Sequence, residues 1–290
     1  MRSPDLPTPA IVVGIDGSRI GISAALWAVD EAVSRDIPLR LVYAIEPDDR
    51  STYERDCRDA AREFADAEIA VRAAVMAVES TDEPVKIEVE IAQDRPARVL
   101  REQSRSAPML CLGALGFHQA TGRRVGSTAA ALAETAHCPV AVIRGHHPSP
   151  PVPRCVVAVV DESPESHDVL KLAVAEAILR RAPLRVLTTW HPRFTDMSGA
   201  NVLAENNRQI RAHHERMLSP YGKSHPDLDA RPVAVPGNIE SYLARNADSI
   251  GLVVIGRRHP AGLAELLGLG HSMLHDADCS VLICPVHSAL

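Results

Sequence analysis

The 290-residue sequence lacks the features that mark several large classes of protein. Basic residues are not in excess: the net charge is −6 and the pI is near 6.1, which argues against a broad nucleic-acid-binding surface. Apolar runs fall far short of the ~20 residues that a membrane-spanning helix needs, and the N-terminus carries no apolar signal-peptide segment. We therefore expect a cytoplasmic protein with neither nucleic acid nor membrane as a partner.

The six cysteines form no Cys-x-x-Cys pair and show no metal-ligand spacing. Cys111, Cys138 and Cys279 lie in or beside apolar segments, which favours small buried side chains over disulfides or metal ligands. The adjacent His146 and His147 have no third ligand near them in the sequence. We predict no metal site built from protein ligands alone and a reducing compartment.

An internal duplication is the most informative feature that the chain does have. Residues 11–40 match residues 156–185 at a constant offset of 145, and eleven positions are identical, including the pairs Asp16/Asp161 and Ser18/Ser163. Each copy has about 140 residues, an ordinary domain size. We predict one domain at residues 1–145, a second at 154–290, and a Pro-rich linker at 146–153.

Short apolar runs alternate with amphipathic stretches in both copies. In the first copy we predict strands at 10–15, 39–45, 85–91, 109–112 and 140–143, and helices at 21–36, 53–79, 95–105 and 128–136. Strict alternation over 85–91 is typical of a strand near a sheet edge. On the helix at 53–79, the apolar face includes Phe64 and Ile69.

The second copy repeats the pattern, with strands predicted near 155–160, 184–189, 231–235, 252–255 and 280–284. Its second helix, near 201–218, is expected to be shorter and to carry His213 and His214 on its surface, without the i, i+4 histidine pair of a zinc site. Alternating strands and helices predict an α/β protein: two tandem doubly wound, Rossmann-like domains, each with a five-stranded parallel sheet of order 3-2-1-4-5. The terminal strands of the two copies are apolar and should pack the halves as an intramolecular pseudo-dimer or support a homodimer.

Doubly wound sheets bind ligands at the carboxyl ends of their strands, where the strand order reverses. In the first copy this position brings Asp16-Gly17-Ser18 together with Gly113-Ala-Leu-Gly116. Glycines allow backbone N–H groups to approach phosphate oxygens, and a helix N-terminus at Gly126-Ser127-Thr128 adds further donors. Turn glycines followed by a helix N-cap are the structural alternative for the same pattern.

Three segments together resemble a known family: Val13-Gly14-Ile15-Asp16-Gly17-Ser18, the spacing Gly113-x2-Gly116-x9-Gly126-Ser127, and His137-Cys138-Pro139-Val140. The chain resembles a tandem universal stress protein of the ATP-binding branch. The resemblance implies ATP as the ligand and leaves open whether Mg²⁺ accompanies it. It places Asp16 and Val42 by the adenine and ribose, Gly113 and Gly116 around the nucleotide, and Gly126 and Ser127 at the phosphates. Gly14 and Thr128 complete the expected nucleotide-binding set.

Each copy departs from this pattern in its own way. The first has Phe117-His118-Gln119 where relatives of this kind are basic or Gly-rich, and Arg123 or Arg124 could supply the cation. In the second, Val159 replaces Gly14, His259 replaces Gly116 and Leu269 replaces Ser127. We expect weak nucleotide binding at most in the second copy, although Arg257 and Arg258 leave an altered anion site open.

The sequence offers no catalytic residue: nothing beside the glycines resembles a general base with an orienting partner or a two-metal carboxylate set. The expected function is therefore that of an ATP-binding regulatory or sensor protein in a stress response, with slow hydrolysis at most. Two alternatives stay open. One is a slow ATPase or phosphoryl or adenylyl transferase, with His118 as its candidate residue, and the other is an interaction module that binds no nucleotide.

Overall fold

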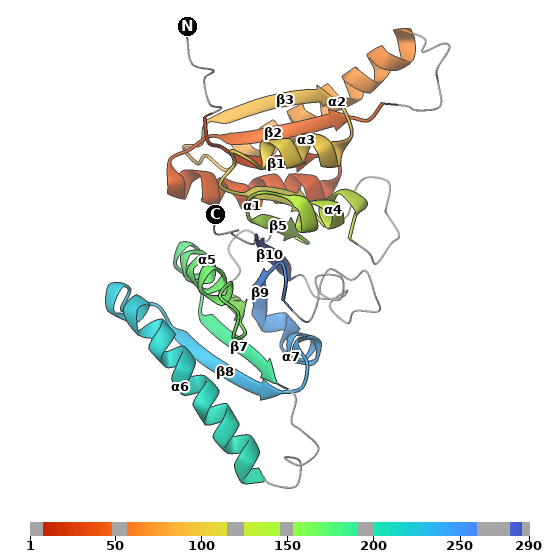
Figure 1. Cartoon of the computed structure of the whole chain (residues 1–290). Coiled ribbons are helices and arrows are strands. Elements are labelled where there is room, and N and C mark those ends of the chain that lie inside the picture. The colour runs from red at the N-terminus through yellow and green to blue at the C-terminus, as the bar shows by residue number, and fades with distance from the viewer. Residues whose placement is uncertain are drawn as a thin grey trace, which may run out of the picture. The chain divides into compact units, whose positions relative to one another are not determined.

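The structure is a computed structural model that describes residues 8–47, 57–114, 125–145, 153–190, 200–259 and 279–285. The chain divides into two compact units, Met1–His146 and His147–Leu290, which are described separately (Figure 1). Each unit is an α/β domain built around a five-stranded parallel sheet.

The first unit alternates strands and helices along the chain. Its elements are β1 (Ile11–Ile15), α1 (Arg19–Arg35), β2 (Leu39–Ile45), α2 (Cys57–Glu79), β3 (Ile87–Gln93), α3 (Pro96–Gln103), β4 (Leu110–Gly113), α4 (Ser127–Thr135) and β5 (Val140–Ile143). The strands follow the order β3-β2-β1-β4-β5, and all neighbours run parallel. The predicted order 3-2-1-4-5 is confirmed, and the alternating segment near residues 85–91 is the edge strand β3.

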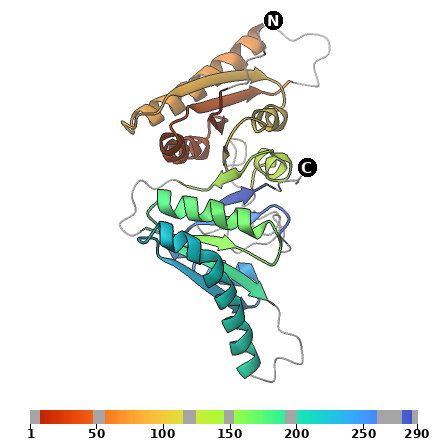
Figure 2. The same cartoon turned by 60° about the vertical axis from the view of Figure 1, so that its left-hand side comes forward.

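The second unit repeats this topology. Its elements are β6 (Cys155–Val159), α5 (Ser166–Leu179), β7 (Leu184–Trp190), α6 (Ala200–Ser224), β8 (Ala230–Pro236), α7 (Ile239–Arg245), β9 (Ile250–Gly256) and β10 (Ser280–Cys284). The order β8-β7-β6-β9-β10 is again 3-2-1-4-5, with β6 in the place of the first strand. Figure 2 shows α6, in teal, running along this sheet.

Helices cover both faces of each sheet, which is why the central strands are continuous apolar runs. In the first unit α1 and α2 lie together on one face, and α3 and α4 on the other. Ile11, Val13 and Leu110 are completely buried between these layers. Burying such side chains contributes ~2 kcal/mol each, so the duplicated apolar pattern is sufficient to specify two cores.

Two expectations for the long helices are wrong. Helix α6 does not end near residue 218 but continues through Pro220 to Ser224, so it is not shorter than α2. Proline normally ends a helix because it lacks an N–H group. Here Pro220 lies on the exposed side of the last turns, where water can satisfy the carbonyl that has lost its donor.

The second error concerns the side chains of α2. Phe64 and Ile69 were expected on its apolar core face, but they are 43% and 67% exposed. The buried face consists of Ala67, Val71, Ala74 and Val78. These four residues follow the 3.6-residue period closely, whereas Ile69 lies on the opposite side of the helix.

No helix in the described part of the chain is long and apolar enough to cross a membrane. Five cysteines fall within the ranges whose side chains are described, and none of them is in a disulfide. Four of the five, Cys111, Cys138, Cys279 and Cys284, are buried, as expected for small apolar side chains.

Candidate functional site

The carboxyl ends of three strands meet at one edge of the first sheet. Gly14 on β1 is in register with Val42 on β2, and Val13 is in register with Cys111 on β4. The segments that follow β1 and β4 therefore leave the sheet side by side, as expected at the switch point, where the strand order reverses. Residues 115–124, which include Gly116, His118, Arg123 and Arg124, lie outside the described residues.

The turn after β1 is held by its own side chains. The Ser18 N–H donates to Asp16 Oδ1 at 3.0 Å, and Ser18 Oγ accepts the Gly21 N–H at 2.9 Å, which caps helix α1. Between them Gly17 has a φ of +80°, a left-handed conformation that favours glycine. Asp16 thus has a structural role in an Asx-type turn, whatever else it contacts.

The start of helix α4 is different because no side chain of the described residues caps it. Its N-cap residue is Gly126, whose N–H donates to the Ala114 carbonyl at 2.8 Å and ties the helix start to the end of β4. Ser127, in the first turn, is exposed and Thr128 is half-buried. The first-turn N–H groups of α4 therefore carry the positive end of the helix dipole toward an accessible surface, an arrangement suited to an anion.

Two predicted site glycines have a packing role. A Cβ on Gly14 would lie 2.7 Å from Leu112 Cδ2 and 3.0 Å from Leu100 Cδ1. A Cβ on Gly113 would lie 3.0 Å from Gly21 N and from Ile20 C, both backbone atoms of the first turn of α1. Each glycine thus permits a close approach within the protein, which explains its presence without a ligand.

Negative charge gathers at the β2 side of the same edge. Burial raises the pKa of the half-buried Tyr43 hydroxyl, and the nearby carboxylates of Asp16, Asp66 and Glu63 raise it further. The α4 side of the edge ends instead in first-turn N–H groups that no described side chain caps. The edge is therefore polarised, with acidic groups near β2 and the positive helix end near β4.

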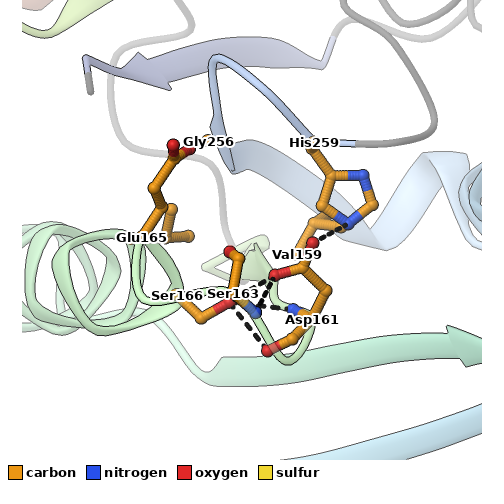
Figure 3. Close-up of a pocket in the computed structure, with 8 residues that line it drawn as sticks. Val159, Asp161, Ser163, Glu165, Ser166, Gly256 and His259 are labelled. Carbon is orange, nitrogen blue, oxygen red and sulfur yellow. Dashed lines mark hydrogen bonds and ion pairs between the residues drawn. The ribbon is translucent and has the colours of Figure 1, made fainter.

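In the second unit, Asp161 follows β6 as Asp16 follows β1. The Ser163 N–H donates to Asp161 Oδ1 at 2.9 Å, which reproduces the Asp16–Ser18 turn. Ser166 adds a second link, because its Oγ lies 2.9 Å from Asp161 Oδ1 and accepts the Asp161 N–H (Figure 3). Burial by itself raises the Asp161 pKa, but the hydrogen bonds from Ser163 and Ser166 and the charge of nearby His259 bring it below its usual value.

His259 lies over this turn at the position that corresponds to Gly116. Its Nε2 is 4.0 Å from Asp161 Oδ2, and Figure 3 shows the ring directed toward that carboxylate. Burial lowers the His259 pKa, although Asp161 acts in the opposite direction. Among the described residues the pocket here, including its open mouth, has a volume of about 170 Å³. That is below the roughly 300–1,000 Å³ of small-molecule sites.

Sequence reasoning placed His214 on an exposed helix face, and the structure corrects this: the residue is only 3% exposed. Thr188 Oγ1 donates to the Val160 carbonyl at 2.8 Å, so its 3.2 Å contact with His214 Nε2 must be donated by the histidine. His214 Nδ1 is buried without a hydrogen-bond partner in the described part of the chain. Burial, with a smaller contribution from His213, lowers the His214 pKa to about 4. The signal available in the sequence was its helical spacing with Leu218, which is buried on the same face.

No group of three or more His, Cys, Asp or Glu side chains that could hold a metal ion occurs among the described residues. Two doubly wound units in tandem, each with an aspartate-anchored turn after its first strand, define the structural class: a duplicated Rossmann-like α/β protein.

Comparison with known proteins specifies the family. The sequence profile of the universal stress protein family matches residues 8–144 and 154–285, and the chain belongs to that family. It is 44% identical over 279 residues to universal stress protein Rv2028c of Mycobacterium tuberculosis, covering 95% of each chain. It is 41% identical over 280 residues to universal stress protein Rv3134c of the same species, covering 95% of this chain and 96% of the relative.

A solved structure supports the fold. The crystal structure of a universal stress protein from Archaeoglobus fulgidus superposes with a TM-score of 0.68 at 14% identity, over 97% of this chain and 99% of that one. At this identity the likeness concerns the fold alone. It extends over both units.

Proposed function

We propose that the first unit binds ATP at the carboxyl edge of β1 and β4, and that occupancy of this site regulates the protein in a stress response. The observation that carries the proposal is the uncapped start of α4, joined by the Gly126–Ala114 hydrogen bond to the end of β4. An exposed helix N-terminus at a switch point suits a phosphate group.

The polarity of the edge favours one orientation of the nucleotide. The phosphates would bind at Gly126, Ser127 and Thr128, where N–H groups and hydroxyls are available. The opposite orientation would bring them toward Asp16, Glu63 and Asp66, which repel anions. The base and ribose are therefore assigned to the β2 side, near Asp16 and Val42, with Gly14 and Gly113 shaping the floor between the two ends.

The remaining site assignments follow the family resemblance. Gly116 would pass close to the phosphates, and Arg123 or Arg124 would add a cation. Mg²⁺, if present, would neutralise phosphate charge, and Asp16 is the one carboxylate of the predicted set. We assign ATP the role of an effector rather than a rapidly turned-over substrate, since a ligand that binds one conformation better shifts the protein toward it.

Calorimetric titration of ATP into the Gly116→Val variant tests the assignment. The added side chain should abolish binding by excluding the nucleotide from the backbone. Gly222→Val is a matched control, because a Cβ at Gly222 meets nothing within 4 Å and that residue lies on α6 of the second unit. Unchanged ATP affinity in Gly116→Val, with the control also unchanged, would remove the proposed site.

The rival readings have their own tests. The first test is to purify the protein without added nucleotide, denature it and look for released ATP, ADP or AMP. If none is released and titration also detects no binding, the nucleotide-free interaction module replaces this proposal. Hydrolysis near the ~10 s⁻¹ typical of enzymes would instead show that the protein is an efficient ATPase and would overturn the effector role.

A further inference from the structure

We propose that the outer edge of strand β3 pairs antiparallel with the same edge of a second copy of this chain, forming a two-fold symmetric dimer. This surface is separate from the nucleotide site and from the terminal strands of either unit. Three observations support it: the backbone groups of β3, the exposed apolar side chains beside it, and the charges along it.

The backbone of β3 presents unpaired hydrogen-bonding groups. The Leu39 N–H donates to the Lys86 carbonyl at 2.8 Å, and Leu39 is in register with Ile87, so the even-numbered residues of β3 bond to β2. The N–H and C=O groups of Ile87, Val89 and Ile91 therefore point away from the sheet. In the part of the chain that the structure describes, no strand pairs with this outer side.

The corresponding edge of the second unit is blocked by prolines. The Gly237 N–H donates to the Trp190 carbonyl, and the Leu184 N–H to the Asp229 carbonyl, so the odd-numbered residues of β8 bond inward. Pro232 and Pro236 thus occupy outward positions and remove the N–H groups that another strand would need. β3 contains no proline, so one edge of the duplicated fold is protected against pairing and the other is available.

Apolar side chains flank the open edge. Val89 is 51% exposed and Phe64 of α2 is 43% exposed. Ala70 lies on the flank of α2 that faces Gly17, the residue just past the end of β1. Phe64 is ~120° around the helix from Ala70, on the flank toward β3. A strand added to β3 would cover Val89, and burial of apolar surface is the main favourable term in association.

The charges of β3 and of Lys86, which precedes it, are compatible with a symmetric antiparallel register. With Glu88 opposite the Glu88 of the second copy, Ile87 faces Val89 and Lys86 faces Glu90, each twice by symmetry. Ile87 and Val89 then exchange backbone hydrogen bonds, because both have outward groups. The two Lys86–Glu90 pairs are opposite-charge cross-strand pairs, which are favourable.

The like-charged pair at the centre of this register is partly neutralised within each chain. Glu88 accepts hydrogen bonds from Arg40 at 3.0 and 3.2 Å and from Lys86 at 2.8 Å. These hydrogen bonds lower the Glu88 pKa, and the one from Lys86 is the principal cause. Burial acts in the opposite direction. Shifting the register by two residues in one direction would place Glu88 opposite Glu90 and lose the Lys86 pairs. The shift in the other direction would place Lys86 opposite Glu88, and rescue by the double exchange Lys86→Glu/Glu90→Lys distinguishes this register from the one with Lys86 opposite Glu90.

Sedimentation velocity over a range of concentrations tests the dimer with two single variants and one double variant of the full chain. Val89→Pro removes two of the four Ile87–Val89 backbone hydrogen bonds while leaving the bonds to β2 in place, and should raise the dimer Kd ~10- to 100-fold. Lys86→Glu should raise it about tenfold by placing like charges opposite each other. The double exchange Lys86→Glu/Glu90→Lys should restore association.

Lys223→Glu is the matched control, since it makes the same charge change at an exposed position on α6 and should leave the dimer unchanged. Circular dichroism checks that Val89→Pro is folded, and Lys86→Glu decides the question if it is not. A wild-type chain that stays monomeric at every concentration overturns the proposal. So does a dimer that neither Val89→Pro nor Lys86→Glu weakens, because it must use another surface.

Discussion

Alanine substitution at two equivalent glycines should have different effects on the two units. Gly113 ends β4 and Gly256 ends β9 at the corresponding position, and both have φ values that alanine accepts. At Gly113 the new Cβ would lie 3.0 Å from Gly21 N, Ile20 C and Ile20 Cγ2. Two of these are backbone atoms of a packed helix, so they cannot move aside as a side-chain end can.

The expected cost of Gly113→Ala is about 1–3 kcal/mol of unfolding free energy, typical of overpacking. At Gly256 the nearest atoms are Glu165 Oε2 at 3.3 Å and Val169 Cγ2 at 3.5 Å, both on side chains. There alanine should be neutral or stabilising by about 0.5 kcal/mol, because it reduces the entropy of the unfolded chain.

The two tryptophans allow each unit to be followed separately. Trp27 lies in α1 of the first unit and Trp190 ends β7 of the second, and the chain has no others. Urea titration monitored by tryptophan fluorescence would report on the first unit in a Trp190→Phe background and on the second in a Trp27→Phe background. If Gly113→Ala leaves the Trp27 transition within about 0.5 kcal/mol of its parent, the close packing of Gly113 against α1 is refuted.

Three further predictions concern the ligand and pH. Adding ATP should slow hydrogen exchange across residues 125–129, while steady-state ATP hydrolysis stays far below ~10 s⁻¹. Rapid hydrolysis with unchanged exchange would show that ATP is a substrate rather than an effector. Titration should find one strong ATP site per chain, and two equal sites would contradict the different roles of Gly116 and His259. Because the folded-state pKa of His214 is about 4 against 6.5 unfolded, the second unit should be fully stable above pH 6.5 and lose up to about 3 kcal/mol as the pH falls toward 4. Urea midpoints followed at Trp190 in the Trp27→Phe background should show this loss with both histidines present and with His213→Gln, and much less of it with His214→Gln.

The topology could be predicted from the sequence because it depends on features that repeat. Buried parallel strands are short apolar runs, helices between them are amphipathic, and right-handed crossovers leave few possible strand orders. The internal duplication provided each element twice, so the alternating segment that became β3 was supported by its counterpart β8. Strand boundaries shifted by only one or two residues, as at Ile87 and Leu110.

The errors occurred where tertiary context overrides a local pattern. Helix α6 was expected to end near residue 218, but it continues through Pro220, which lies on an exposed side of the helix. Hydrophobicity alone assigned Ile69 to the core, although its helical angle places it opposite Ala67 and Val71. His214 shows the reverse case, a polar residue whose burial depends on Thr188, a partner far away in sequence.

Differences between the two copies do not all carry the same information about a ligand. Asp16 and Asp161 are identical because both fix the turn after the first strand, through the N–H groups of Ser18 and Ser163. The exchange of Gly14 for Val159 follows from packing, since Leu112 and Leu100 occupy the space that a side chain at Gly14 would need.

The position of Gly116 and His259 is therefore the more informative difference. His259 reaches back over Asp161 and reduces the space at the switch point of the second unit. A glycine has no side chain that could occupy the corresponding space in the first unit. The sequence difference between Gly116 and His259 bears on the proposed ligand site independently of the glycines inside the strands.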